Sequence, residues 1–197
     1  MRDGRARPGH FACNGPNPMP SLGPKPMLIV FAGLPGVGKT ALARALAGRI
    51  GAVHLRIDSI EQAIRAAMPP DREMDDTGYR VARAVAADNL RLGHTVIADA
   101  VNPIAAVRTA WRAVAQSIPV AAFEIEVTCS DTGEHRRRIE TRTRDIPGLP
   151  LPTWDDICDQ VRGGGYEPWD RERLVVDTFR RSVDETVDAV RAALTGG

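Results

Sequence analysis

Eight consecutive residues near the start of the chain follow the pattern G-x-x-x-x-G-K-[S/T]: Gly33, Leu34, Pro35, Gly36, Val37, Gly38, Lys39 and Thr40. An apolar run from Leu28 to Ala32 precedes them, and an amphipathic stretch from Thr40 to Ile50 follows. The run predicts a buried strand and the stretch predicts a helix. Glycines at such a junction let several backbone N–H groups turn towards one point at the helix N-terminus. The sequence therefore predicts an anion-binding loop.

The residues of this loop indicate its ligand. Lys39 adds a positive charge that can reach the β and γ phosphates of a nucleoside triphosphate, and the Thr40 hydroxyl can ligate Mg²⁺. We expect ATP and Mg²⁺ to bind, with contacts from the eight loop residues and from Ala41. The alternative is a glycine-rich turn that binds nothing. The sequence lacks the N-K-x-D motif of signalling GTPases, and it lacks the apolar run ending in Asp-Glu that is typical of motor ATPases.

Short apolar runs alternate with helical patterns along the rest of the chain. Strands are expected at 28–32, 53–57, 95–98, 120–128 and 174–176, and helices at 40–50, 60–67, 77–92, 103–116, 131–144, 153–161 and 182–194. Thr153 is expected to cap its helix, and Ser182 with Glu185 forms a capping-box pattern. The alternation predicts an α/β three-layer sandwich around a five-stranded parallel sheet.

Composition sets limits on the domain organisation. Residues 1–26 hold six of the 15 prolines and four of the 18 glycines, so we expect a flexible extension before one domain at 27–197. The extension carries four basic residues and one acidic residue, a net charge of +3. The whole chain has a net charge of +1, so the domain has a net charge of about −2. That charge speaks against a nucleic-acid partner.

The sequence also lacks the features of several other protein classes. The three cysteines form no C-x-x-C pair, so no zinc site or disulfide framework is indicated. No apolar run has the roughly 20 residues that cross a bilayer, and the first residues lack the apolar core of a secretory signal. We expect a cytoplasmic monomer or homodimer with no membrane partner.

Two aspartates follow predicted strands. Asp58 comes after V-H-L-R-I, and Asp99 comes after T-V-I-A. Ligands in open α/β sheets lie at the carboxyl ends of the strands. A carboxylate there can accept a proton from an attacking hydroxyl, hold Mg²⁺ through water, or bind the acceptor. The alternatives are that Asp58 only caps a helix and that Asp99 only forms a turn.

Arginines are concentrated between Glu134 and Gly148. On the predicted helix 131–144, Arg138 and Arg142 lie one turn apart on a shared face. Guanidinium groups that arrive as a site closes can stabilise charge on a transferred phosphoryl group, so we expect a short helical lid at about 131–152. The alternative is a solvated helix face on which acidic neighbours pair with the arginines.

Three segments resemble a known group, the adenylate-kinase-like phosphotransferases. R-I-D-S-I-E-Q-A-I, Arg56 to Ile64, resembles the segment of chloramphenicol phosphotransferases that supplies the catalytic base, which implies this role for Asp58. V-I-A-D-A-V-N-P, Val96 to Pro103, resembles the D-x-x-N segment of phage-type polynucleotide kinases and of small bacterial P-loop kinases such as the zeta-toxin-like proteins. This second resemblance implies that Asp99, Asn102 and Arg108 contact the acceptor.

The third resemblance concerns the lid. Adenylate-kinase-like phosphotransferases carry an R-x-x-x-R pair on the lid helix, and Arg138 and Arg142 match its spacing, with Arg144 as a substitute. The group also places adenine near the loop after the last strand, here Asp177 to Arg180.

Together these features predict a small ATP-dependent kinase that transfers the γ-phosphate to a hydroxyl of a small-molecule acceptor. Lys39, Asp58, Arg138 and Arg142 are the predicted catalytic residues, Asp58, Asp99, Asn102 and Arg108 the predicted acceptor contacts, and Thr40 and Asp99 the predicted Mg²⁺ ligands. A regulatory ATPase without a dedicated acceptor and a 5′-hydroxyl polynucleotide kinase are the alternatives. The sequence leaves the identity of the acceptor open.

Overall fold

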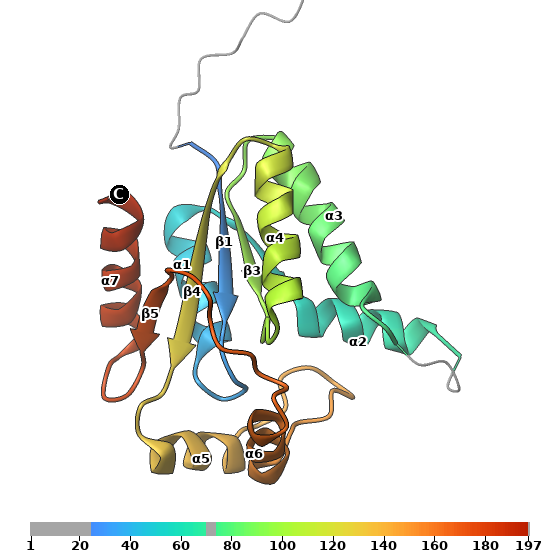
Figure 1. Ribbon diagram of the computed structural model, residues 1–197, viewed down its shortest axis with the longest axis vertical. Helices are drawn as coiled ribbons and strands as arrows, with labels where there is room; N and C mark the ends of the chain where they lie inside the picture. The colour runs from blue at the N-terminus through green and yellow to red at the C-terminus, as the bar shows by residue number, and fades with distance from the viewer. Residues whose placement is uncertain (1–24, 70–73, 197) are drawn as a thin grey trace, which may run out of the picture.

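The computed structural model describes residues 25–69 and 74–196. They form a central parallel sheet with helices on both faces (Figure 1). The strands are β1 (Met27–Ala32), β2 (Val53–Arg56), β3 (Val96–Asp99), β4 (Ala121–Thr128) and β5 (Leu174–Asp177). The helices are α1 (Lys39–Ile50), α2 (Ile57–Ala67), α3 (Thr77–Arg91), α4 (Ala105–Ser117), α5 (Thr132–Glu140), α6 (Trp154–Arg162) and α7 (Val183–Thr195). The predicted α/β sandwich with five parallel strands is confirmed.

The strand order is β2-β3-β1-β4-β5, so β1 lies at the centre of the sheet. Phe31 of β1 pairs in register with Asp99 of β3, which in turn pairs with Arg56 of β2. All five strands run in the same direction, and their carboxyl ends meet at one edge. The loop Gly33–Thr40 leaves β1 at that edge, and α5 and α6 lie beyond it (Figure 1).

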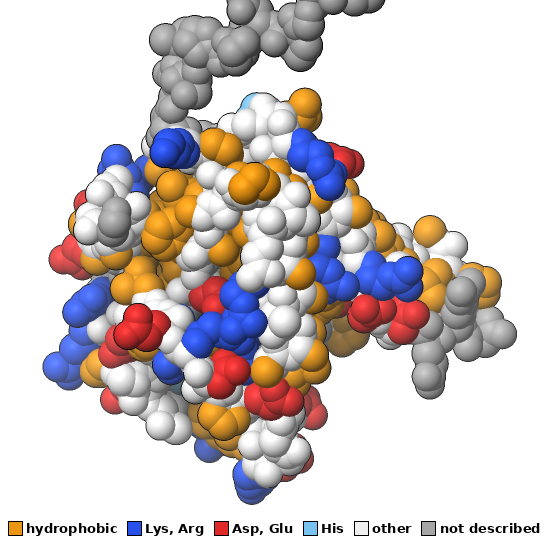
Figure 2. Space-filling view, turned by 45° about the horizontal axis from the view of Figure 1, so that its top comes forward, with side chains coloured by type: hydrophobic (Ala, Val, Ile, Leu, Met, Phe, Trp, Pro, Cys, Tyr) orange, Lys and Arg blue, Asp and Glu red, His pale blue; other side chains and the backbone are white. Residues whose placement is uncertain are grey.

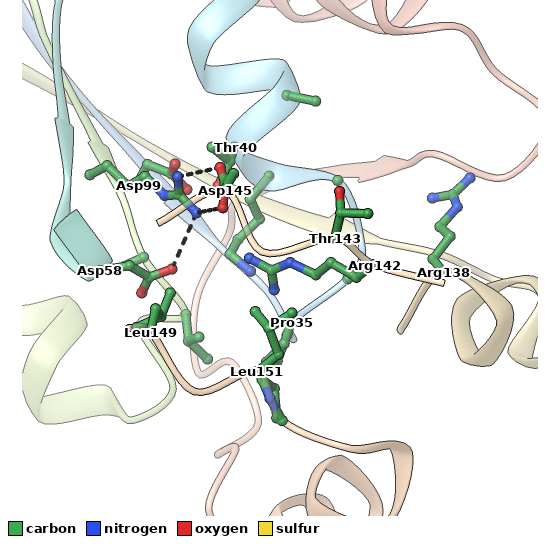
Figure 3. A pocket seen from close by; sticks show the side chains of 18 of the residues that line it. Pro35, Thr40, Asp58, Asp99, Arg138, Arg142, Thr143, Asp145, Leu149 and Leu151 are labelled. Carbon is green, nitrogen blue, oxygen red and sulfur yellow. Dashed lines mark hydrogen bonds and ion pairs between the residues drawn. The ribbon is translucent and has the colours of Figure 1, made fainter. Parts of the chain in front are cut away.

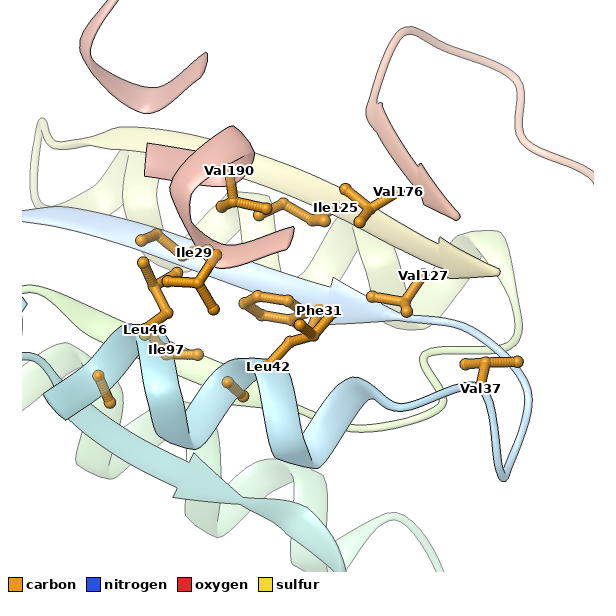
Figure 4. Packing of buried hydrophobic residues seen from close by; sticks show 13 residues of the cluster. Ile29, Phe31, Val37, Leu42, Leu46, Ile97, Ile125, Val127, Val176 and Val190 are labelled. Carbon is orange, nitrogen blue, oxygen red and sulfur yellow. The ribbon is translucent and has the colours of Figure 1, made fainter. Parts of the chain in front are cut away.

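The core has two layers because side chains of β1 alternate between the two faces of the sheet. Ile29 and Phe31 pack with Leu42 and Leu46 of α1 and with Val190 of α7 (Figure 4). Leu28 and Val30 face the other way, towards Ala82 and Ala86 of α3 and Trp111 of α4. Burial on both faces explains the continuous apolar run of β1, which fixes the loop that follows it.

Helix ends follow local chemistry. As predicted, Thr153 caps α6, and Ser182 caps α7 through a capping box. The structure shows a complete capping box at Thr153 as well, formed with Asp156. Gly51, in the left-handed conformation with φ of 66°, closes α1 by donating its N–H to the carbonyl oxygen of Ala47. These signals lie within a few residues of one another, so the sequence alone predicts them.

Most element boundaries agree with the prediction within two residues, and two differ by three residues or more. Helix α2 begins at Ile57, directly after β2, so Asp58 lies in its first turn. Helix α5 ends at Glu140, four residues before the predicted end, so Arg142 and Arg144 lie in the irregular segment that follows. The Thr141 hydroxyl donates to the carbonyl oxygen of Arg137 at this helix end, and Asp145 binds Arg56 of β2.

The predicted flexible extension falls on residues 1–26, of which 1–24 lie outside the described residues and remain a prediction. None of the helices in the described part of the chain is long and apolar enough to cross a membrane. On the face seen in Figure 2, basic and acidic side chains are interspersed, and no broad basic surface is visible there. This mixture agrees with the near-neutral charge of the sequence.

Candidate functional site

A cavity of about 540 Å³ lies at the carboxyl edge of the sheet. Its walls come from the phosphate loop, the ends of β2 and β3, and residues 138–152 (Figure 3). The cavity brings together five residues that the sequence analysis selected separately, namely Lys39, Asp58, Asp99, Arg138 and Arg142. Segments far apart in the sequence therefore contribute to one site.

The glycines of the loop allow its conformation. Gly33, Gly36 and Gly38 have φ of 136°, 81° and 102°, a region that L side chains rarely adopt. A Cβ atom at Gly33 would collide with the carbonyl oxygen of Val127, and one at Gly36 would collide with the side chain of Ile139. The loop thus follows a path that only glycine permits at these positions, and it ends at the N-terminus of α1, where unpaired backbone N–H groups favour an anion.

Lys39 is the buried cation of this loop. The residue is 8% exposed, and its Nζ atom donates a hydrogen bond of 2.8 Å to the carbonyl oxygen of Leu34. Burial lowers the pKa of Lys39 to about 8, against the opposing effect of the charges on Asp99 and Asp58. An anion in the cavity would compensate the lost hydration of this ammonium group.

Asp99 ends β3 and is 3% exposed. Its Oδ2 atom lies 3.2 Å from Nε2 of His54, which fits a hydrogen bond donated by the imidazole. Burial works to raise the pKa of Asp99, but the hydrogen bond from His54, the charge of Lys39 and the Thr40 hydroxyl together hold it below its usual value. The carboxylate is therefore ionised at neutral pH beside the phosphate loop.

The residues beside the loop fit Mg²⁺. The Thr40 hydroxyl and the Asp99 carboxylate line the same cavity and offer the hard oxygen donors that this ion prefers. Among the described residues no group of three or more His, Cys, Asp or Glu forms a metal cage. Mg²⁺ usually binds to one or two protein oxygens, substrate phosphates and waters, so a sparse donor set is the expected one.

Asp58 lines the cavity from the first turn of α2. Arg56 holds the N-cap position of this helix and no side chain caps it, so Asp58 does not have the capping role weighed as an alternative. Its side chain is 39% exposed, and its Oδ2 atom lies 3.9 Å from the guanidinium of Arg56. This carboxylate can reach a ligand that enters the cavity.

The two predicted lid arginines have different surroundings. Arg138 donates to Glu134 at 2.8 Å and to the Thr178 hydroxyl at 2.7 Å, and Thr178 in turn donates to the carbonyl oxygen of Val37 at 2.9 Å. The side chain of Arg142 makes no hydrogen bond or ion pair within the described ranges, and it points towards Asp58 and Asp99 (Figure 3). It is close enough to Lys39 for its charge to depress the lysine pKa.

The helical geometry predicted for these arginines is wrong, since α5 ends before Arg142. The two side chains therefore do not share a helix face, although both line the cavity. Arg144, the proposed substitute, is exposed and is not part of the cavity wall.

The structure does not bring Asn102 and Arg108 into the cavity. Asn102 is fully buried, with Nδ2 donating to the carbonyl oxygen of Phe31 at 2.7 Å and Oδ1 accepting from Trp111 at 3.0 Å. Arg108 is also fully buried, donates to the carbonyl oxygen of Pro168 at 3.0 Å, and lies 4.4 Å from the ring centroid of Trp169. These contacts are structural, and the acceptor contacts predicted for both residues are not supported by their placement.

Sequence reasoning missed three polar residues in or beside the site, His54, Arg56 and Asp145, and it included Thr178 only within the loop 177–180 that the resemblance places near adenine. Arg56 and His54 belong to β2, and a charged residue at the end of a short apolar strand is a weak signal for a site. Asp145 and Thr178 act through partners 89 and 141 residues away, which no local pattern reveals.

No curated protein matches the chain. Among solved structures, similar chains include the APS kinase CysC of Mycobacterium tuberculosis in complex with AMPPNP and APS, with 21% identity, a TM-score of 0.63, and coverage of 87% of this chain and 98% of that one. A gluconokinase of Sinorhizobium meliloti has 17% identity and a TM-score of 0.59, with 87% and 93% covered. Kti12 of Chaetomium thermophilum in complex with ADP-AlF3 has 21% identity and a TM-score of 0.62, with 86% and 100% covered.

Likeness at these identities establishes the fold, which is that of small P-loop kinases. This chain has the features described above for such a fold: the phosphate loop, the parallel strand order and the cavity at the carboxyl edge of the sheet. The family model described as the AAA domain matches residues 28–162 of the 197, and the chain therefore belongs to this AAA domain family.

Proposed function

We propose that the protein is an ATP-dependent phosphotransferase that moves the γ-phosphate to a hydroxyl group of a small-molecule acceptor. The observation that carries this proposal is the placement of the Asp58 carboxylate in the same cavity as the phosphate loop. A hydrolase that uses only water needs no acceptor-binding carboxylate on the far side of the phosphates. The fold shared with an APS kinase and a gluconokinase supports the same reaction class.

The phosphate loop binds the triphosphate. Its backbone N–H groups and the N-terminus of α1 face the phosphate oxygens, and Lys39 adds a full charge beside the β and γ phosphates. The hydrogen bond from Lys39 to Leu34 holds the ammonium group within the loop before the nucleotide arrives. Thr40 and Asp99 would hold Mg²⁺, which supplies neutralisation of charge on the β and γ phosphate oxygens when it is bound.

Asp58 orients the acceptor and accepts its proton. The hydroxyl oxygen of the acceptor forms a bond to the γ-phosphorus, the bond from that phosphorus to the bridging oxygen breaks, and ADP leaves with the electron pair. The hydroxyl proton passes to the Asp58 carboxylate, which is exposed enough to release it to water afterwards. Reaction within the cavity also excludes competing water.

Arg142 stabilises the charge that spreads over the transferred group. It is the cavity arginine without a protein partner in the described ranges, so its guanidinium is available for phosphate oxygens. Arg138, which is bound to Glu134 and Thr178, is better suited to hold the loop and the nucleotide in place.

The test is phosphate transfer from γ-labelled ATP with Mg²⁺ to a panel of sugars, nucleosides, hydroxylated antibiotics, hydroxy acids and a 5′-hydroxyl oligonucleotide. We expect the wild type to transfer phosphate to one class of acceptor. In Asp58→Asn the rate of this transfer should fall at least about a hundredfold. Asp88→Asn, on the exposed surface of α3, is the matched control.

Two outcomes would contradict the proposal. ATP turnover that stays equally low with every acceptor and is unchanged in Asp58→Asn would indicate a regulatory ATPase. Labelling of the oligonucleotide alone would indicate a polynucleotide kinase.

A further inference from the structure

We infer that Asp145 is a positioning residue, which anchors the segment 141–153 to the end of β2 through Arg56 and thereby holds Arg142 in the cavity. The segment, called the lid segment below, connects α5 to α6 and has no regular secondary structure. The inference rests on the proposed function for the role of Arg142, whereas the anchor itself is a property of the fold.

The anchor has the geometry of a strong ion pair. Arg56 donates from Nη1 to Oδ2 of Asp145 at 2.6 Å and from Nη2 to Oδ1 at 3.0 Å, a bidentate arrangement of two planar groups. The Arg56 side chain is 5% exposed, and its hydrogen bonds lower the pKa of Asp145 to about 2. The pair therefore stays ionised throughout the neutral pH range.

The partner of Asp145 is fixed. Arg56 is the last residue of β2 and pairs in register with Asp99 at the end of β3. Asp58, two residues further on, lies 3.9 Å from the same guanidinium. A displacement of Asp145 would therefore change both the position of the lid segment and the contacts of the guanidinium beside Asp58, the proposed base.

The rest of the lid segment has few other attachments. The hydrogen bonds that its backbone N–H groups donate are local, from Thr141 to Arg137, from Arg142 to Ile139 and from Leu149 to Ile146. In the described part of the chain, all side-chain hydrogen bonds between this segment and the sheet or α1 involve Asp145. Its carboxylate accepts them from Arg56 of β2 and from Arg44 of α1. The Arg44 pair, at 3.3 Å, is exposed and contributes little.

The position of Arg142 depends on this anchor. Arg142 lies three residues before Asp145 and one residue beyond Thr141, which caps the C-terminus of α5, so two fixed points enclose it. Its side chain reaches into the cavity between Arg138 and Asp58 (Figure 3). Without the anchor, the chain between Thr141 and the capping box at Thr153 has no side-chain hydrogen bond to the body of the protein in the described ranges.

Asp145→Asn tests the anchor because it keeps the shape of the side chain and removes its charge. The change removes the bidentate carboxylate partner of the Arg56 guanidinium, so we expect the lid segment to open more often and trypsin to cut after Arg142 at least about tenfold faster. Asp145→Glu retains the carboxylate and should restore most of the protection. Asp155→Asn, on the exposed face of α6, and Arg44→Gln are matched controls that should leave cleavage unchanged.

The effect on the reaction separates positioning from loss of structure. In Asp145→Asn we expect kcat to fall about tenfold while the Kd for ATP and the melting temperature stay close to the wild-type values, because the phosphate loop is intact. In the Arg142→Ala background, the same change should have no further effect on kcat. Arg56→Lys, which keeps the charge and loses the bidentate contact, should reproduce the cleavage and kcat changes if Asp145→Asn fails to fold.

The outcomes are distinct. Equal cleavage rates for wild type, Asp145→Asn and Arg56→Lys would overturn the anchor. A loss of kcat that persists in full in the Arg142→Ala background would overturn the positioning of Arg142. Absence of phosphate transfer from a wild type that binds ATP would instead contradict the proposed function, and the cleavage rates would still decide whether Asp145 anchors the segment.

Discussion

The Nζ atom of Lys39 donates a hydrogen bond of 2.8 Å to the carbonyl oxygen of Leu34, so the ammonium group is held inside the loop that surrounds it. One neutral oxygen replaces little of the hydration that burial removes, and burial lowers the pKa of this lysine to about 8. A triphosphate beside it would favour the charged form and raise the pKa again. The charge of Lys39 is therefore linked to the occupancy of the loop.

We expect ATP binding to take up a proton above pH 8. Below that pH Lys39 is charged in both the free and the bound protein, and binding leaves its protonation unchanged. Above pH 8 the free protein has lost this proton while the complex retains it, so uptake approaches one proton and the affinity falls as pH rises. Isothermal titration calorimetry at pH 7 and pH 9, in buffers of different ionisation enthalpy, measures the uptake.

Lys39→Arg is the control for this linkage, because a guanidinium stays charged at both pH values. Its binding should show no proton uptake at pH 9. The same uptake in wild type and Lys39→Arg would mean that another group, or the nucleotide itself, is the source.

The contrast between the two cavity arginines predicts different kinetic effects. Arg142 has no protein partner in the described ranges, so Arg142→Ala should lower kcat by about a hundredfold or more and leave the KM for ATP nearly unchanged. Arg138 connects α5 to Thr178, which binds the carbonyl oxygen of Val37 in the phosphate loop. Arg138→Ala should therefore mainly raise the KM for ATP. Steady-state kinetics with the acceptor saturating distinguishes these effects, and the reverse pattern would exchange the two roles.

The parts of this site that depend on local sequence were predictable. The path from β1 through the phosphate loop to α1 follows from an apolar run, glycines with positive φ and an amphipathic helix, all within 24 residues from Met27 to Ile50. The central strand β1 was predicted because burial on both faces of a parallel sheet imposes a continuous apolar run, and the other four strands were predicted from short apolar runs between helical patterns. Asp99 was predicted at a strand end because the carboxyl edge is where such a sheet binds ligands.

The positions that depend on distant partners were not predictable. The end of α5, and with it the position of Arg142, coincides with the pairing of Asp145 with Arg56, which is 89 residues away. Asn102 matches a motif position, but its amide bonds to Phe31 and Trp111 remove it from the cavity. A motif gives the residue type at a position, whereas packing decides which way the side chain points.

Asp99→Asn should raise the Mg²⁺ concentration required for half-maximal activity by about ten- to a hundredfold, a loss typical of weakened metal contacts. The amide keeps the shape of the side chain and the contact with His54 but lacks the negative charge. ATP binding without Mg²⁺ should change little, since Lys39 and the loop amides remain. Titration of activity with Mg²⁺ at saturating ATP measures the effect. An unchanged Mg²⁺ requirement would remove Asp99 from the proposed ligands.

Asn102→Ala should destabilise the protein while leaving the site chemistry intact. The change leaves the carbonyl oxygen of Phe31 and the Nε1 atom of Trp111 buried without their partner, and two such unsatisfied groups cost about 2–4 kcal/mol. Urea unfolding followed by circular dichroism measures the free energy of unfolding. Asn89→Ala is the control, because the Asn89 amide bonds to Val85 at an exposed position and its loss should cost less than about 1 kcal/mol. If Asn102→Ala were as stable as the wild type but unable to transfer phosphate, the acceptor contact predicted from the sequence would replace the structural role seen here.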